Sequence, residues 1–392
     1  MTIPHLPPEL VDHIIHLLRG SPKVLRNCCL VSKSWIPRTR RYLYADIEFR
    51  TATSLQTWKR TFLDPLTSPA CYANTLSVAC THVVTAADAQ PGGWIRGFSN
   101  VVHLEVGRPS TYGSASAGSL ISFHALSPIL KSLHVHLLIL SPSRVLDLIL
   151  SFPLLEDLTV TACENSVDDS GGSDGLSTTV RRSSGQPMFT GSLELTNPGI
   201  KPISLRLLSL PGGIHFRKLV LKWSKVEDLP LTTALVDACS HTLESLDITY
   251  PCCKSIRIRI RVNSLIAFLV VLGSASLNLS KATKLGDVVF RLGWLSVEWV
   301  TTILQTITPM HRGLRHISIY MPPYLPESIH PSVPVRRIVG EEIYRQWSGL
   351  DRLLIQLWES HSIRTKVGRD TRDYIGRLLP AVEGGGVIDL VE

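Results

Sequence analysis

Apolar residues recur along most of the chain in sets, each with a first member followed by others three and five positions later. The clearest sets begin at Val101, Leu130, Leu155, Phe216, Leu243, Leu285 and Leu314. The last two members of each set flank a single residue, usually polar, which predicts a short strand with one buried face. The intervals between first members are 29, 25, 61, 27, 42 and 29 residues. Four of these six intervals match the length of one repeat in an αβ array.

Amphipathic helices are expected before several of these strands, at residues 143–152, 232–241 and 297–307. One strand with one helix cannot bury its own apolar face, so such repeats must stack on their neighbours. The predicted fold class is therefore α/β, with a body at residues 98–334 built as an irregular αβ solenoid. A single compact α/β domain with evenly spaced strands is the alternative.

Three stretches depart from the repeat. Residues 164–192 are rich in Ser, Gly and Asp and too poor in apolar residues to offset the cost of ordering, which predicts a mobile loop. Residues 256–262 alternate aliphatic residues with arginine, which predicts an additional strand with a solvent-exposed basic face. Residues 335–392 include a long amphipathic stretch, and we expect a helical C-terminal cap and tail that closes the array.

The first fifty residues follow a helical pattern. Pro8 and Pro22 suit the first turns of helices, Gly20 can end the first helix, and apolar residues recur at helical spacing, so three short helices are expected. A unit of about forty residues rarely buries its own apolar surface without disulfides, a metal or a partner. The residues expected to form a docking interface or its supporting core are Leu6, Pro7, Leu10, Ile14, Leu17, Leu18, Leu25, Val31 and Trp35.

These N-terminal residues resemble the F-box of fungal, basidiomycete-type proteins, the adaptor-binding module of cullin-type ubiquitin ligases. The matching stretches are Leu6-Pro7-Pro8-Glu9-Leu10, Val31-Ser32-Lys33-Ser34-Trp35 and Arg40-Arg41-Tyr42-Leu43-Tyr44. The body is similar to a degenerate leucine-rich-repeat array, with the full spacing only in Leu155-x-x-Leu158-x-Val160-x-x-Cys163. The domain order expected from these resemblances is an F-box at 1–50, a helical linker at 51–97, the repeat body at 98–334 and the cap at 335–392.

The resemblance implies a non-catalytic substrate-recognition subunit of a cullin-type ubiquitin ligase. Its first domain would bind a Skp-type adaptor and, through it, a cullin scaffold, while the repeat body would hold a protein target. Two alternatives stay open. One is an adaptor-independent interaction scaffold that packs its first three helices on its own body, and the other is a nucleic-acid-binding protein.

Polar residues between the apolar strand positions point away from the core, because side chains alternate along a strand. The candidates for substrate contact are Glu105, His134, His136, Asp157, Lys222, Asp247, Arg291, His316 and Tyr320. Their mixed charge suits a protein ligand better than a polyanion. His134 and His136 could hold a metal only with a third ligand from a neighbouring repeat, so we expect an exposed polar face and no metal site.

Composition narrows the function further. The chain has 392 residues with 44% hydrophobic content, enough for two or three domains, and its net charge of +8 is spread over scattered basic residues, which is weak evidence for nucleic acid. The eight cysteines form no C-x-x-C motif, and no nucleotide-binding or hydrolase motif is present, so we expect no cofactor and no catalysis. Without a secretion signal or a spanning apolar run, the chain is expected in the cytoplasm or nucleus, away from membranes.

Overall fold

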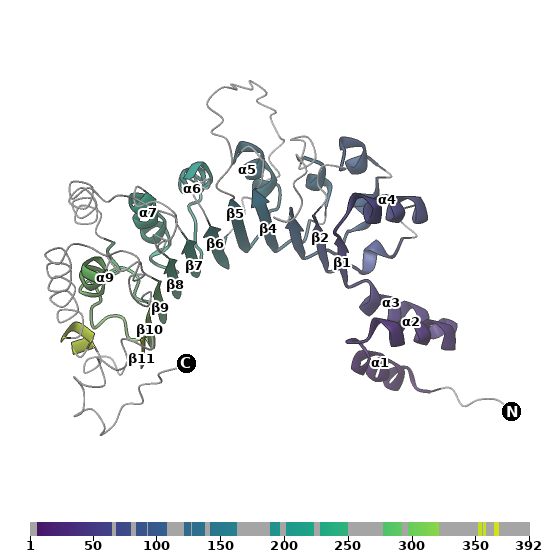
Figure 1. Ribbon diagram of the computed structural model, residues 1–392, viewed down its shortest axis with the longest axis horizontal. Coiled ribbons are helices and arrows are strands. Elements are labelled where there is room, and N and C mark those ends of the chain that lie inside the picture. Colours follow the sequence, from purple (N-terminus) through teal and green to yellow (C-terminus); the bar gives the residue numbers. More distant parts are fainter. Residues whose placement is uncertain are drawn as a thin grey trace, which may run out of the picture. The chain divides into compact units, whose positions relative to one another are not determined.

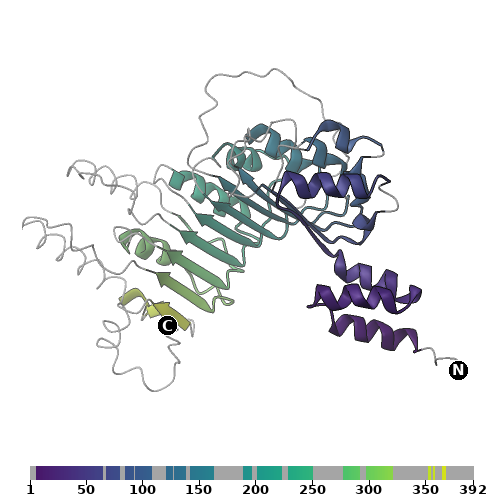
Figure 2. The same ribbon diagram turned by 45° about the vertical axis from the view of Figure 1, so that its right-hand side comes forward.

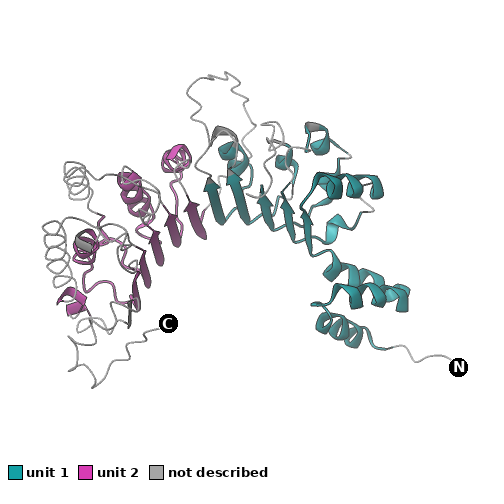
Figure 3. Ribbon diagram, in the orientation of Figure 1, with its two compact units in different colours: residues 1–188 teal, residues 189–392 magenta. Residues whose placement is uncertain are grey.

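The computed structural model describes the chain in two units, residues 1–188 and 189–392, coloured separately in Figure 3. The residues described are 6–64, 68–79, 84–91, 93–107, 121–126, 128–137, 142–162, 189–196, 201–222, 228–249, 277–291, 297–320, 352–354, 356–357 and 364–367.

The first unit opens with the three predicted helices, α1 (Pro8–Leu17), α2 (Pro22–Val31) and α3 (Ile36–Leu43), with the short 3-10 turn η1 (Lys33–Trp35) before α3. Each α-helix carries a proline in its first two positions, where the missing N–H would have no intrahelical partner anyway. A small core holds them together. Its buried members are Val11, Ile15 and Leu25, partly covered by Leu18, Trp35, Tyr42 and Leu43.

Parallel strands paired in chain order make the sheet of the first unit (Figure 1). They are β1 (Asp46–Phe49), β2 (Thr75–Val78), β3 (His103–Val106), β4 (Ser132–Leu137) and β5 (Asp157–Ala162). One face is covered by α4 (Ala52–Thr61), α5 (Pro142–Leu150) and the 3-10 turns η2 (Pro69–Tyr72), η4 (Ala86–Ala89), η5 (Trp94–Gly97) and η6 (Ile121–Ala125) (Figure 2). Helix α4 begins at a capping box, in which the Thr51 and Ser54 side chains each accept from the other's backbone N–H.

The second unit repeats this arrangement. Its parallel strands, also paired in chain order, are β6 (Ser192–Thr196), β7 (Lys218–Lys222), β8 (Ser245–Thr249), β9 (Asp287–Arg291), β10 (His316–Tyr320) and β11 (Arg364–Val367). Helices α6 (Lys201–Leu208), α7 (Leu229–Cys239) and α9 (Val297–Leu304) cover one face of this sheet (Figure 1). The predicted α/β class is confirmed, with parallel strands in both units.

A repeated pair of backbone hydrogen bonds sets the register at the start of most of the described strands. The Asn74 carbonyl, just before β2, accepts from the N–H groups of Val102 and His103 at 2.8 and 3.0 Å. In the second unit the Arg217 carbonyl accepts in the same way from residues 244 and 245, at 2.7 and 3.0 Å. A slip of one residue would turn the apolar set of a strand to the wrong face, so this register and the apolar spacing reinforce each other.

The apolar spacing predicted from the sequence marks the core. Every member of the seven sets is buried, with no side chain more than 2% exposed. The strand β6 also follows the pattern, because Leu193 and Leu195 are fully buried. The helices predicted before three of the strands are present as α5, α7 and α9.

The prediction of a helical linker at residues 51–97 is wrong, because this segment contains strand β2. Ala73, Leu76 and Val78 follow the same spacing as the other sets, and all three are fully buried. Strand β1, within residues 1–50, continues the pattern toward the N-terminus. The repeat was hidden because a small alanine holds the first position of its set and gives little apolar signal.

Two further predictions need correction. The predicted loop extends too far, because Ser192 begins β6 and Phe189, just before it, is buried and packs on Phe216 with ring centroids 5.2 Å apart. The predicted cap is not helical throughout, since β11 extends the sheet, while residues 352–354 and 356–357 are helical. The remainder of the predicted loop, the strand at 256–262 and most of the cap lie outside the described residues.

Among the described residues, no helix has the length and apolar character that a bilayer-spanning segment requires.

The core of the N-terminal helices gives a first test. Ile15→Ala should destabilise them by about 2–5 kcal/mol, because Ile15 is fully buried and its truncation leaves a cavity. Leu17→Ala should stay within about 0.5 kcal/mol, because Leu17 faces outward. Hydrogen exchange of peptides from residues 8–43 measures both effects locally. Equal loss of protection in the two variants would contradict the described packing.

Candidate binding surfaces

The first candidate surface lies on the N-terminal helices. Helix α1 turns Val11 and Ile15 inward, which leaves Leu10 and Leu17 on its outer side with 51% and 68% of their surface exposed. Helix α2 buries Leu25 and Cys28 and leaves its end apolar, with Leu30 85% exposed. We call the exposed apolar residues here the N-terminal apolar set: Leu6, Leu10, Leu17, Val24, Leu30 and Val31.

Some of the predicted adaptor-binding residues are exposed, and the others lie wholly or partly in the core beneath them. Leu6, Leu10, Leu17 and Val31 are exposed, and so is Pro7, which is the N-cap of α1. Ile14, Leu18 and Trp35 are half-buried, whereas Leu25 lies in the small core. Leu25 is therefore a structural residue.

The sequence did not predict which apolar residues of α1 face the core. It placed Leu10, Ile14 and Leu17 together and passed over Val11 and Ile15, which are the buried residues. Two adjoining apolar stripes on one helix have the same periodicity, so spacing alone does not say which of them faces the core.

The N-terminal helices are also strongly basic. Residues 8–43 contain seven Lys or Arg against two Asp or Glu, and the exposed cations include Lys23, Arg26, Lys33, Arg40 and Arg41. Arg38 Nε lies 2.7 Å from Asp12 Oδ1 and so joins α3 to α1. Most of the positive charge is therefore left available to a partner.

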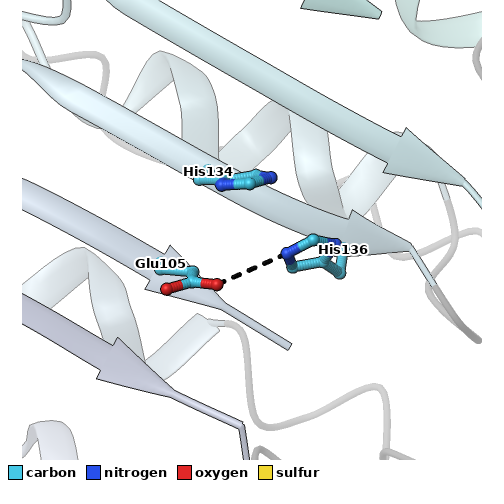
Figure 4. A group of neighbouring side chains, drawn as sticks. All are labelled: Glu105, His134 and His136. Atoms are coloured by element: carbon cyan, nitrogen blue, oxygen red, sulfur yellow. Dashed lines mark ion pairs between the residues drawn. The ribbon is translucent and has the colours of Figure 1, made fainter. Parts of the chain in front are cut away.

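The second candidate surface is the polar face of the sheet in the first unit. In-register pairing places Ser77 of β2, Glu105 of β3 and His134 of β4 in one row across the strands. His136 lies two residues further along β4 and shares this face (Figure 4). The row follows from equal positions in successive repeats, since each of the three stands four residues after the first member of its set.

The Glu105, His134 and His136 side chains come together (Figure 4). His136 Nε2 lies 3.5 Å from Glu105 Oε1, and the two imidazole centroids are 4.3 Å apart with ring planes at 38°. One nitrogen or oxygen from each residue lies within 4.8 Å of the other two. All three residues are half-buried rather than exposed, and Glu105 supplies the third ligand that the histidine pair required. The predicted Asp157 pairs in register with Ser132 and lies outside this group.

On the polar face of the second unit, side chains of neighbouring strands contact one another. Arg291 Nη2 lies 3.2 Å from Asp247 Oδ2, and the guanidinium stacks over the Tyr320 ring at 4.7 Å from its centroid. His316 Nδ1 lies 2.6 Å from Asp287 Oδ1. Lys222 contacts Glu194 of β6 in the same way.

These contacts join Lys222, Asp247 and Arg291 to oppositely charged neighbours, while His316 contacts Asp287 and Tyr320 lies against the Arg291 guanidinium. The partner Glu194 was not predicted, although it stands at an outward position of the strand pattern, as Asp287 does. Pairing balances the charges locally and leaves a face of mixed sign. Such a face suits a protein surface with interspersed charges better than a polyanion.

The cysteines among the described residues are free thiols, and they differ in burial. Cys28 and Cys239 are buried, and Cys29 and Cys71 are half-buried. Burial raises the pKa of the Cys239 thiol to about 12. The reactive thiolate is therefore a minor species at neutral pH.

No protein-family model matches the chain, and no curated protein matches it either.

Cys239 offers a test of this environment. Because burial holds its pKa at about 12, iodoacetamide at pH 8 should modify Cys29 and Cys71 well before Cys239 in the folded chain. Peptide mass spectrometry follows the three sites, and full modification after unfolding serves as the control. Equal rates for the three thiols in the folded chain would show that Cys239 is not sealed in the core.

Proposed function

We propose that this chain is a non-catalytic substrate-recognition subunit of a cullin-type ubiquitin ligase. In this proposal residues 1–50 form an F-box that binds a Skp-type adaptor, and a leucine-rich-repeat-like solenoid holds a protein target. The observation that carries the proposal is the exposure of the N-terminal apolar set on a three-helix unit whose residues resemble that module.

The amount of exposed apolar surface on two short helices supports a docked partner. Single exposed leucines are ordinary on protein surfaces. Here Leu10 and Leu17 lie on one side of a ten-residue helix, and Leu30 and Val31 end the next helix. Covering a leucine side chain stabilises a complex by about 1.5–3 kcal/mol, so even partial cover of this set favours binding.

The positive charge of the N-terminal helices favours an acidic partner. The helices α2 and α3 carry exposed lysine and arginine side chains in the same three-helix unit as the apolar set. An acidic adaptor would be drawn to this region and oriented on it, because complementary charge raises the association rate and fixes the register. The small core of Val11, Ile15 and Leu25 keeps the helices folded while they present the set.

The polar strand faces are the proposed target-binding surface. Their side chains project from paired strands, so a target would meet a preorganised surface and lose little free energy to ordering of the receptor. The receptor then acts by position, since holding a target near a loaded conjugating enzyme raises the effective concentration of its lysines. No catalytic group of this chain is needed for that role.

The two alternative functions predict different behaviour. An adaptor-independent scaffold would cover its first helices itself, and the exposure of Leu17 and Leu30 speaks against such cover by the described residues. A nucleic-acid binder would lose affinity steeply as salt rises. In the second unit Arg291 and Lys222, two cations of the strand face, are paired with carboxylates, which lowers the positive charge available for that purpose.

The adaptor interface can be tested with two outward substitutions. Leu10→Asp combined with Leu17→Asp should weaken binding of a purified Skp-type adaptor to the full chain at least 100-fold, because both carboxylates would be buried in the interface. Leu63→Asp is the matched control, since Leu63 is 84% exposed in the same unit but lies outside the three helices. Isothermal titration calorimetry measures the affinities.

Circular dichroism of both variants should match the original chain, because neither substitution enters the core. Unchanged adaptor affinity in the double variant, or no adaptor binding by the original chain, would contradict the proposal.

A further inference from the structure

We propose that Glu105, His134 and His136 form a binding site for one divalent transition-metal ion, with Zn²⁺ as the preferred occupant. The site goes beyond the proposed function, because neither adaptor docking nor target binding requires it. It lies on the polar face of the first unit, where β3 supplies the carboxylate and β4 supplies both imidazoles (Figure 4).

The spacing of the donor atoms fits an ion after a small closure. The three ligand atoms lie within 4.8 Å of one another. An ion at the centre of such a triangle would stand at most about 2.8 Å from each atom, whereas zinc bonds to nitrogen and oxygen measure about 2.0–2.2 Å. A shift of under about 1 Å per side chain closes the difference, which small rotations of these side chains supply without backbone movement.

The donor chemistry selects the class of ion. Two neutral imidazoles with one carboxylate form a three-ligand set that zinc uses when it keeps a further position open. Imidazole nitrogen suits zinc and the neighbouring transition ions, while Mg²⁺ and Ca²⁺ prefer oxygen donors alone. We therefore expect tight binding of Zn²⁺ or Co²⁺ and no competition from Mg²⁺ or Ca²⁺.

The strands hold the three side chains in place. Glu105 is opposite His134 in the register of β3 and β4, and His136 follows at the next position on the same face. Gly107 continues β3 toward His136 with a φ of +80°, and a Cβ atom there would stand 2.8 Å from the His136 carbonyl oxygen. Only glycine allows this close approach, so the backbone beside His136 is fixed by sequence as well as by pairing.

A buried hydroxyl beside the cluster is a second, independent observation. Ser77 of β2 lies in the same row next to Glu105 and is only 7% exposed. Its Oγ has no hydrogen-bond partner among the described residues. A buried hydroxyl of this kind is generally satisfied by a bound water or ion when no protein group reaches it. A water on the open position of the metal, or a hydrogen bond from Ser77 to the Glu105 carboxylate, would satisfy it.

The test uses the full chain after removal of metal with a chelator. Zn²⁺ is titrated in competition with a chromophoric chelator, and Co²⁺ is added in parallel so that its visible absorption reports the geometry. The variants are Glu105→Gln, His134→Gln and His136→Gln. His103→Gln is the matched control, because His103 is an exposed histidine on the same strand face outside the cluster.

We expect one equivalent of Zn²⁺ per chain in the original protein and in the control. Each ligand variant should bind at least tenfold more weakly and lose the tetrahedral Co²⁺ spectrum. Thermal melts identify a variant that fails to fold, and the two other ligand variants then carry the comparison. The proposal is overturned if the three variants bind like the control, if Mg²⁺ displaces Zn²⁺, or if the original chain binds less than one equivalent.

Discussion

In-register parallel pairing is the constraint on which the rest of this structure depends. A carbonyl before one strand accepts two consecutive N–H groups of the next, so equivalent positions of successive repeats line up in rows. Rows three and five residues into each repeat are apolar and face the helices. The row between them carries Ser77, Glu105 and His134, and its chemistry follows from residues about one repeat apart in the sequence. The register that buries the apolar residues on one face of the sheet therefore also determines which polar side chains are neighbours on the other face.

The N-terminal helices obey a different constraint, which is size. Three helices of eight to ten residues bury few side chains, chiefly Val11, Ile15 and Leu25 with Cys28 and Thr39, since so short a chain has little interior. Their remaining apolar residues, such as Leu17 and Leu30, are exposed because the small core has no room for them. The proposed adaptor would cover these residues, whereas the apolar strand positions of the two sheet units are already buried within the chain.

Some elements of this fold could be predicted from the sequence and others could not, for different physical reasons. Strands with large apolar residues at every position of the set were predictable, because burial of one face requires that alternation. The repeat that begins at Ala73 was not, since a small residue can fill a tight position without an apolar signal. The inward stripe of α1, with Ile15, was ambiguous beside an equally apolar outer stripe. Glu105 and His134 were each predicted, but their meeting depends on register, which one strand alone does not specify.

The central claim, that another polypeptide covers the outer face of the N-terminal helices, is tested most directly by hydrogen exchange of the full chain with and without a purified Skp-type adaptor. We predict that peptides from residues 6–31 gain protection in the complex while those from β2 to β5 exchange unchanged. Protection spread over the sheet, or no change at the helices at saturating adaptor, would contradict the account.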